Sequence, residues 1–410
     1  MQAASHSMAS IASFRSLCFW SSVEYGSFLS GLVRDLNECG VPATQRYQVS
    51  QHSYRGAQTP WQRILLRVRM YGVYPLQLVW AVLTGRRDTV HIVCTNTFYA
   101  PILAAWAASI RGAPTIHLAY DLYPDVLTVA GTLRFDSRIC RIMEWLVRKT
   151  MHACAANVFL GKRQLRHAVD RFGTIPRATV IPVGADARSL AAAANDREHH
   201  MPPTVLYCGN MGHLHDTDTI ARLLLEEANG RSSDPLPPIC LRFHANGSGY
   251  RSLRAKLGCA TATEARFGAV SVRFADSLPE SEWRQILAGA SVALVTLKAD
   301  AGRIALPSKA YSAMAAGQAI LAIGPGDSDL ADLIEAHDCG WRVSPGDVTA
   351  LRAVLHAIAS DPETFLSKQQ NALRAARTTY DTAILAKQWE RLIREIAVPQ
   401  SPAPGAIASD

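Results

Sequence analysis

Apolar segments of strand length alternate with segments of helical spacing along most of this chain, and the alternation occurs twice. In the first half, strand-like segments lie at 16–20, 90–94, 113–120, 157–160 and 178–182. In the second half they lie at 204–209, 240–244, 270–274, 292–295 and 319–323. Strands that alternate with helices, as at 28–37 and 138–148, form parallel sheets covered by helices. The sequence therefore predicts an α/β fold with two doubly wound domains.

A polar, alanine-rich and proline-terminated segment separates the two halves. It predicts a linker over 189–203, between an N-terminal domain over 1–188 and a C-terminal domain over 204–380. A helix is expected over 381–397, followed by a disordered tail over 398–410. Because ligands of such sheets bind at the carboxyl ends of the strands, we expect a site between the two halves.

The net charge of +8 and the pI of about 9.1 favour anionic partners, such as a nucleotide or a phospholipid surface. The chain has no zinc-finger spacing, no aromatic RNA-binding pattern and no dense block of Lys and Arg, so no nucleic-acid partner is expected. Its nine cysteines are scattered without a C-x-x-C pair, and the first residues lack a signal-peptide pattern. Both features favour a reducing, cytoplasmic location.

Two apolar segments, 71–83 and 99–110, are shorter than a membrane span. We expect both to be buried helices of the first domain. Three arginines precede the first segment among apolar residues: Arg63, Arg67 and Arg69. This arrangement leaves a peripheral contact with an anionic membrane open as an alternative.

The segment 306–317 reads as a loop followed by a helix of small residues, with Ser308 and Lys309 where the helix begins. A helix N-terminus with an adjacent lysine favours a diphosphate. The alternative is an ordinary crossover with a surface lysine. The loop 209–216, with Gly209 and Gly212, follows the first strand of the same half and permits close approach of a ligand to the backbone. Arg303 is either a phosphate ligand or a solvated charge.

Two further patterns have both a functional and a structural interpretation. Asp121 and Asp125 follow a strand of the first half, where a carboxylate is either functional or a helix cap. Asp327 and Asp329 follow Gly324-Pro-Gly, and such residues can simply cap a helix. His213 and His215 have no third ligand at a suitable spacing, so no metal site is expected there.

Taken together, these segments resemble family-4 glycosyltransferases, in particular the bacterial enzymes of exopolysaccharide, O-antigen and colanic-acid-type synthesis. The matching motifs are 209–216, 307–317 and 324–329, with 121–125 and 180–186 in the first half. The resemblance implies a GT-B fold, with two Rossmann-like domains facing a cleft and a C-terminal helix that crosses back to the first domain. It also implies a nucleotide-sugar donor in the second domain, an acceptor in the first, retention at the anomeric carbon, and no metal or cofactor.

The chain departs from the family pattern at several positions. Ser312 and Ile304 stand where many members carry two glutamates, Asn210 and His215 where they carry Arg and Lys, and Tyr120 where they often carry His. The resemblance implies donor binding by Gly209, Asn210, Gly212, His215, Arg303, Ser308, Lys309 and Ser312. It implies acceptor or sugar binding by Tyr25, Gly26 and Tyr120. The candidate catalytic residues are Asp121 and Lys309.

The function implied is transfer of a sugar, with retention, to a saccharide acceptor or to one linked to undecaprenyl diphosphate, in bacterial surface polysaccharide synthesis. The enzyme would work in the cytoplasm, at the inner face of the cell membrane. Two alternatives stay open at this point. One is a nucleotide-sugar epimerase on the same fold, and the other is a non-catalytic homologue that binds the donor.

Overall fold

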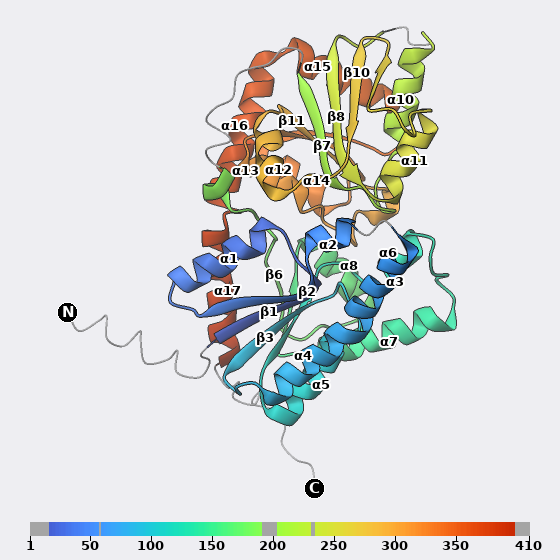
Figure 1. Ribbon diagram of the computed structural model, residues 1–410. Helices are drawn as coiled ribbons and strands as arrows, with labels where there is room; N and C mark the ends of the chain where they lie inside the picture. The colour runs from blue at the N-terminus through green and yellow to red at the C-terminus, as the bar shows by residue number, and fades with distance from the viewer. Residues whose placement is uncertain (1–15, 57–58, 191–202, 231–233, 398–410) are drawn as a thin grey trace, which may run out of the picture.

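A computed structural model describes residues 16–56, 59–190, 203–230 and 234–397, and it contains two α/β domains (Figure 1). Each domain has one sheet with helices on both sides, and the domains meet at one end of both sheets. The linker expected over 189–203 lies mostly outside the described residues, as does the tail expected over 398–410. The domain boundaries given above stay predictions.

The first domain has a six-stranded parallel sheet with the order β2-β1-β3-β4-β5-β6. In β1, the six residues from Leu17 to Ser22 are all buried, as expected for a strand whose two faces are both covered. The strands are β1 (Ser16–Val23), β2 (Ala43–Val49), β3 (Thr89–Cys94), β4 (Thr115–Ala119), β5 (Ala156–Phe159) and β6 (Ala178–Val180). The helices are α1 (Ser27–Glu38), α2 (Gln51–Gly56), α3 (Pro60–Val68), the π-helical turn η1 (Arg69–Val73), α4 (Tyr74–Thr84), α5 (Ala100–Arg111), α6 (Asp125–Val129), α7 (Arg138–Ala153) and α8 (Lys162–Phe172).

The second domain has a seven-stranded sheet with the order β13-β12-β11-β7-β8-β10-β9, parallel except for β9. The strands are β7 (Thr204–Asn210), β8 (Ile239–Asn246), β9 (Glu264–Phe267), β10 (Val270–Ala275), β11 (Val292–Thr296), β12 (Ala319–Ile323) and β13 (Gly340–Val343). The helices are α10 (Asp218–Ala228), α11 (Ser248–Lys256), α12 (Glu280–Ala288), the 3₁₀ turn η2 (Ala299–Ala301), α13 (Lys309–Ala315), α14 (Asp329–His337), α15 (Val348–Ser360) and α16 (Pro362–Thr378).

Each strand that the sequence predicts is present, and the doubly wound architecture is confirmed in both halves. Three strands have no counterpart among the predictions. β2 is a polar edge strand with only its two end residues buried. β9 is an antiparallel edge strand of four residues, and β13 is a four-residue strand at the other edge. Edge strands face water on one side, and so they lack the continuous apolar run of a central parallel strand.

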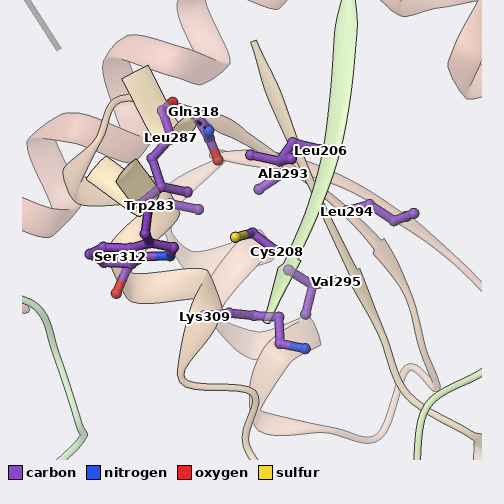
Figure 2. A pocket seen from close by; sticks show the side chains of 11 residues that line it. Leu206, Cys208, Trp283, Leu287, Ala293, Leu294, Val295, Lys309, Ser312 and Gln318 are labelled. Atoms are coloured by element: carbon purple, nitrogen blue, oxygen red, sulfur yellow. Dashed lines mark hydrogen bonds between the residues drawn. The ribbon is translucent and has the colours of Figure 1, made fainter. Parts of the chain in front are cut away.

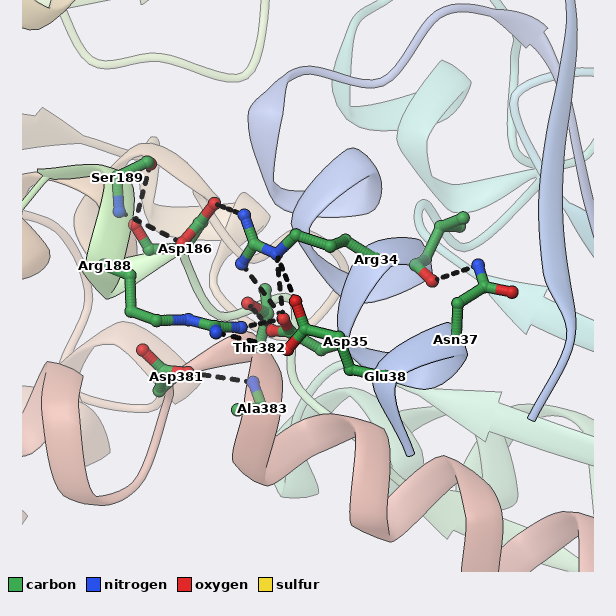
Figure 3. A network of polar contacts seen from close by, with 11 residues as sticks. Arg34, Asp35, Asn37, Glu38, Asp186, Arg188, Ser189, Asp381, Thr382 and Ala383 are labelled. Carbon is green, nitrogen blue, oxygen red and sulfur yellow. Dashed lines mark hydrogen bonds and ion pairs between the residues drawn. The ribbon is translucent and has the colours of Figure 1, made fainter. Parts of the chain in front are cut away.

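The final helix, α17 (Thr382–Ala397), leaves the second domain and packs against α1 of the first, which confirms the expected crossing helix (Figure 1). Its Trp389 lies edge-on to Phe19 of β1 at 5.4 Å. A polar network holds the start of α17 (Figure 3). The Thr382 hydroxyl donates to Asp35 at 2.6 Å, while Arg34 binds the Asp186 carboxylate at 2.7 Å. The first domain therefore depends on the C-terminus of the chain for part of its structure.

The two short apolar segments of the first half differ from the prediction in one respect. Both form helices, α4 and α5, and bury one side against the sheet, as with Leu78 and Val82 of α4. Their other sides expose large apolar side chains, including Leu76, Trp80 and Trp106. No helix among the described residues is long and apolar enough to cross a membrane.

Candidate active site between the domains

The second-domain part of the site lies at the carboxyl end of β7, where Lys309 reaches the strand from the start of α13. Its Nζ donates to the carbonyl oxygen of Asn210 at 3.0 Å and to the hydroxyl of Tyr207. The same Nζ lies 4.1 Å from the centre of the Tyr207 ring, and the Tyr207 hydroxyl donates to the Asn210 carbonyl at 2.9 Å. Lys309 is therefore a positioned cation at the end of the sheet and not a surface lysine.

Burial controls the charge of the polar groups around Lys309. Loss of solvent lowers the pKa of Lys309 to about 7. His215 approaches from the loop that follows β7, and its Nδ1 lies 2.6 Å from the carbonyl oxygen of Thr296. Burial and the neighbouring lysine hold the pKa of His215 well below its usual range, so this ring is neutral at pH 7. Of Lys309 and His215, therefore, Lys309 is the residue whose positive charge titrates near physiological pH.

Glycines shape the loop beside this lysine. Gly209 has a φ of +118° with open space around it, which favours glycine and leaves its backbone accessible. Across the loop, the Gly249 amide donates to the Met211 carbonyl at 2.8 Å, and a Cβ on Gly247 would lie 2.6 Å from that carbonyl oxygen. The segment that contains Gly212 is therefore held against the N-terminus of α11 by close backbone contacts.

The other donor residues predicted from the resemblance occupy different settings. Ser308 is exposed directly before α13, and its side chain makes no capping bond to that helix. Ser312 lines a hollow together with Lys309, Cys208 and Trp283 (Figure 2). Arg303 binds the Asp327 carboxylate instead of standing free in solvent. The structure therefore brings Gly209, Asn210, His215 and Lys309 together, with Ser308 adjacent in the chain, and gives Arg303 an acidic partner.

The first-domain part of the site is built around the carboxyl ends of β3 and β4. The Thr95 hydroxyl accepts the amides of Tyr120 and Asp121 at 3.0 and 3.2 Å and donates to the Asp121 carbonyl at 3.1 Å. No side-chain partner of the Asp121 carboxylate is present among the described residues. Burial raises the pKa of Asp121 to about 6. In contrast, Asp125 binds His167 and Arg171, each at 2.8 Å, and so has a structural role.

An aromatic cluster is built around Tyr120, the residue before Asp121. Tyr25 stacks on Tyr120 with ring centres 4.3 Å apart, and Phe28 lies 6.1 Å from both rings. Gly26 follows Tyr25 at the start of α1. The Tyr120 hydroxyl is buried without a hydrogen-bond partner in the described part of the chain. The three residues predicted to bind the acceptor or sugar, Tyr25, Gly26 and Tyr120, therefore lie together, one of them with an unused polar atom.

The two halves of the site are joined directly. The amide of Leu122, next to Asp121, lies 3.5 Å from the carbonyl oxygen of Ile304, in the loop that leads to Ser308. The Asp329 carboxylate accepts the amides of Arg163 and Gln164 at 2.9 and 3.0 Å. It therefore caps α8 of the first domain from the second domain, since Gly161 before that helix has no side chain to do so.

The arginine at this junction completes the contact. Arg163 binds Asp332 through Nε at 2.8 Å and Asp327 through Nη1 at 2.6 Å. A Cβ on Gly161 would lie 2.1 Å from the Asp329 carboxyl carbon, so only glycine fits there. Of the acidic residues interpreted as simple caps, Asp329 caps a helix of the other domain, while Ser328 caps α14 itself.

Three contributors to the site are absent from the sequence prediction. Tyr207 lies inside an apolar strand and reads as a core residue. Thr95 is one of many threonines at a strand end, and the partners of Arg163 are more than 160 residues away in the chain. Within the described residues, no group of three His, Cys, Asp or Glu side chains is arranged to hold a metal ion.

No family model matches this chain. It is 24% identical over 328 residues, 78% of each chain, to the probable glycosyltransferase WbjE of Pseudomonas aeruginosa. The trehalose 6-phosphate synthase of Burkholderia multivorans superposes with a TM-score of 0.63 at 14% identity, over 94% of this chain and 97% of the other. HepE of Anabaena, solved with UDP, superposes with a TM-score of 0.60 at 14% identity, over 93% and 100%. This chain therefore has the GT-B fold of the glycosyltransferases that it resembles.

Proposed function

We propose that this protein is a retaining family-4 glycosyltransferase that moves a sugar from a nucleoside-diphosphate donor to a saccharide acceptor. The observation that carries the proposal is the placement of Lys309. Its Nζ is fixed against the Asn210 carbonyl at the carboxyl end of β7, and the loop before it contacts the segment that carries Asp121. The printed names of the relatives support the donor class, since WbjE is a probable glycosyltransferase and HepE was solved with UDP.

The proposed role of Lys309 follows from charge. Cleavage of a sugar–diphosphate bond builds negative charge on the leaving group. An ammonium has three N–H bonds, and two of those on Lys309 go to Tyr207 and Asn210. The third is available for a diphosphate oxygen, which in turn favours the charged form of this lysine. A fixed cation stabilises charge as it develops, without reorganisation.

The proposed role of Asp121 is to orient the sugar or the acceptor. Its carboxylate is partly buried, and the Thr95 hydroxyl holds the backbone on either side of it. The unpartnered Tyr120 hydroxyl offers a further polar contact beside it. In a retaining reaction the acceptor hydroxyl attacks the face from which the diphosphate leaves, and the leaving phosphate can take its proton. A dedicated general base is then unnecessary, in agreement with Ser312 and Ile304 at the two glutamate positions.

We further propose that the acceptor is a saccharide on a lipid carrier, undecaprenyl diphosphate, used in bacterial surface polysaccharide synthesis in the cytoplasm. The support is the likeness to WbjE and to the motifs of exopolysaccharide and O-antigen enzymes, together with the net charge of +8, which favours an anionic membrane and a diphosphate carrier.

The test is transfer of a radiolabelled sugar from UDP-, GDP-, dTDP- and CMP-linked donors to undecaprenyl-diphosphate saccharides, with the anomeric configuration of the product read by NMR. We expect one of the three nucleoside-diphosphate donors, and not the CMP-linked donor, to label the lipid with retention. Inversion would contradict the retaining mechanism. Conversion of the donor sugar without any acceptor would show an epimerase. Donor binding without turnover, across the panel, would show a non-catalytic homologue.

A further inference from the structure

Helix α3 is stable as a helix although it buries none of its residues. Thr59 and Gln62 form a capping box before its first turn, with bonds of 3.0 and 3.2 Å, and Pro60 occupies its first position. The helix is thus specified locally, and Leu66 is its only partly buried residue. Helices in proteins are stabilised mainly by packing of an apolar face, so an apolar face of α3 that is exposed to water indicates a partner outside this chain.

The exposed face of α3 is apolar. Trp61, Ile64, Leu65 and Val68 recur at the spacing that places them on one side of a helix, and Trp61 is 79% exposed. Arg67 is exposed at the edge of this stripe. A long apolar stripe bordered by arginine is the pattern of a helix that lies in a membrane interface.

The neighbouring helices of the first domain continue the same pattern. Trp80 of α4 is 70% exposed, Trp106 and Ile110 of α5 are exposed one turn apart, and α7 exposes Ile139, Ile142 and Trp145. α4 packs against α5, and α5 against α7, so these helices form one layer (Figure 1). Exposed basic side chains border the α7 stripe: Arg138, Arg141, Arg148 and Lys149.

The charge of this region identifies the partner. From Cys39 to Tyr120 the chain has eight arginines and one acidic residue, Asp88, which is bound to Arg86. Two copies of this surface would repel one another, whereas a bilayer with anionic lipids attracts it. Tryptophan is also the side chain that favours the interface between headgroups and hydrocarbon.

This surface is connected to the segment that carries Asp121. The Thr97 hydroxyl donates to the Met70 carbonyl at 3.1 Å, and Tyr99 donates to the Tyr71 carbonyl, which ties η1 to the loop after β3. From that loop, Phe98 lies 5.8 Å from the Tyr123 ring, two residues from Asp121. A bilayer against α3 would therefore lie beside the carboxyl ends of the first-domain strands.

We propose that α3, with the outward faces of α4, α5 and α7, is a docking surface for a bilayer that contains anionic lipids. The proposal deepens the proposed function, on which its biological meaning rests, because it names the surface from which a lipid-linked acceptor reaches Asp121. The binding itself needs neither donor nor acceptor and can be measured without them.

The experiment measures co-sedimentation of the full chain with vesicles of phosphatidylcholine alone or mixed with phosphatidylglycerol. We expect binding to the mixed vesicles that falls as salt is added. The double variant Trp61→Ser with Leu65→Ser should bind these vesicles at least about tenfold more weakly than the wild type. Arg67→Gln should bind about fivefold more weakly, the effect of one arginine near an anionic surface.

Matched controls lie in the second domain. Leu225→Ser on α10 and Arg251→Gln on α11 remove an exposed apolar and an exposed basic side chain, and both should bind vesicles as the wild type does. Equal binding by all variants, or no binding to mixed vesicles, would overturn the proposal. So would a dimer in sedimentation velocity that the α3 variant abolishes, since the face would then be a self-association surface. A donor-induced thermal shift measured on the same variants tests the proposed function separately.

Discussion

The two domains share an architecture but present different surfaces to water. Among the large apolar side chains that are exposed in the described residues, Leu225 alone lies in the second domain, and all others lie in the first. In the second domain, Lys309 is held at the carboxyl end of β7 by Tyr207 and Asn210. The first carries arginines and tryptophans on its outside. We infer that the fold was used twice for two tasks, with donor binding in the second domain and contact with a membrane-bound acceptor in the first.

The contrast between the two domains is tested most strongly by removal of the positive charge of Lys309 in the second domain. Lys309→Met should weaken binding of the nucleotide-sugar by about 10- to 100-fold, as expected for loss of a hydrogen bond to a charged group. Isothermal titration calorimetry would measure it. Lys298→Met is the matched control, since Lys298 is exposed in the same domain and its side chain has no bonding partner among the residues that the structure describes. Unchanged affinity of Lys309→Met for the nucleotide-sugar would show that Lys309 does not bind the donor.

The second prediction separates sugar transfer from donor binding. Asp121→Asn should lower sugar transfer by about tenfold or more, while donor affinity changes little, because the proposed role of Asp121 is to orient the reacting groups and the nucleoside diphosphate is proposed to bind in the second domain. The pH dependence of transfer gives a further test. With the pKa of Asp121 raised to about 6, wild-type transfer should fall as pH drops below about 6, and the variant should lose that limb. An acid limb that survives in Asp121→Asn would assign it to another group. Asp136→Asn, at an exposed position, is the control.

The third prediction concerns the junction between the domains. Gly161→Ala would place a methyl group against the Asp329 carboxylate and displace it from the N-terminus of α8. We expect a loss of about 1–3 kcal/mol in the free energy of unfolding, measured by denaturant titration. Gly289→Ala should have little effect, because its Cβ would meet its nearest neighbour at 3.6 Å. Equal stability of the two variants would show that Asp329 does not hold α8.

The last prediction is a gain in stability. Because the pKa of Lys309 falls from 10.5 to about 7 on folding, the folded state resists its protonation. The unfolded chain binds the additional proton between these two values, so the wild type should gain stability as pH rises from 7 to 10.5. Lys309→Met should therefore melt higher than the wild type at pH 7 or below, and the difference should shrink toward pH 10.5. A difference that does not depend on pH would exclude this linkage.

Some features of this molecule follow from local sequence patterns, and others depend on contacts between residues that are distant in the chain. Central strands such as β11 and β12 are almost entirely apolar, and the sequence predicts them directly. The polar edge strand β2 takes its structure from its partner β1 and escapes local pattern reasoning. In the site, Lys309 and Asn210 belong to recognisable motifs. Tyr207 and the cap that Asp329 provides for α8 do not, since each depends on tertiary contacts. The apolar segment that forms α4 was predicted to be buried, and only the structure shows its exposed side.

The central claim is that the cleft face of the second domain binds a nucleoside-diphosphate sugar through Lys309. The most direct test is thermal stabilisation of the wild type and of Lys309→Ala by a panel of UDP-, GDP-, dTDP- and CMP-sugars. We expect a clear shift of the wild type with one of the three nucleoside-diphosphate sugars and loss of that shift in the variant. An equal shift in both proteins, a shift with the CMP-sugars alone, or no shift of the wild type with any member of the panel would contradict the claim.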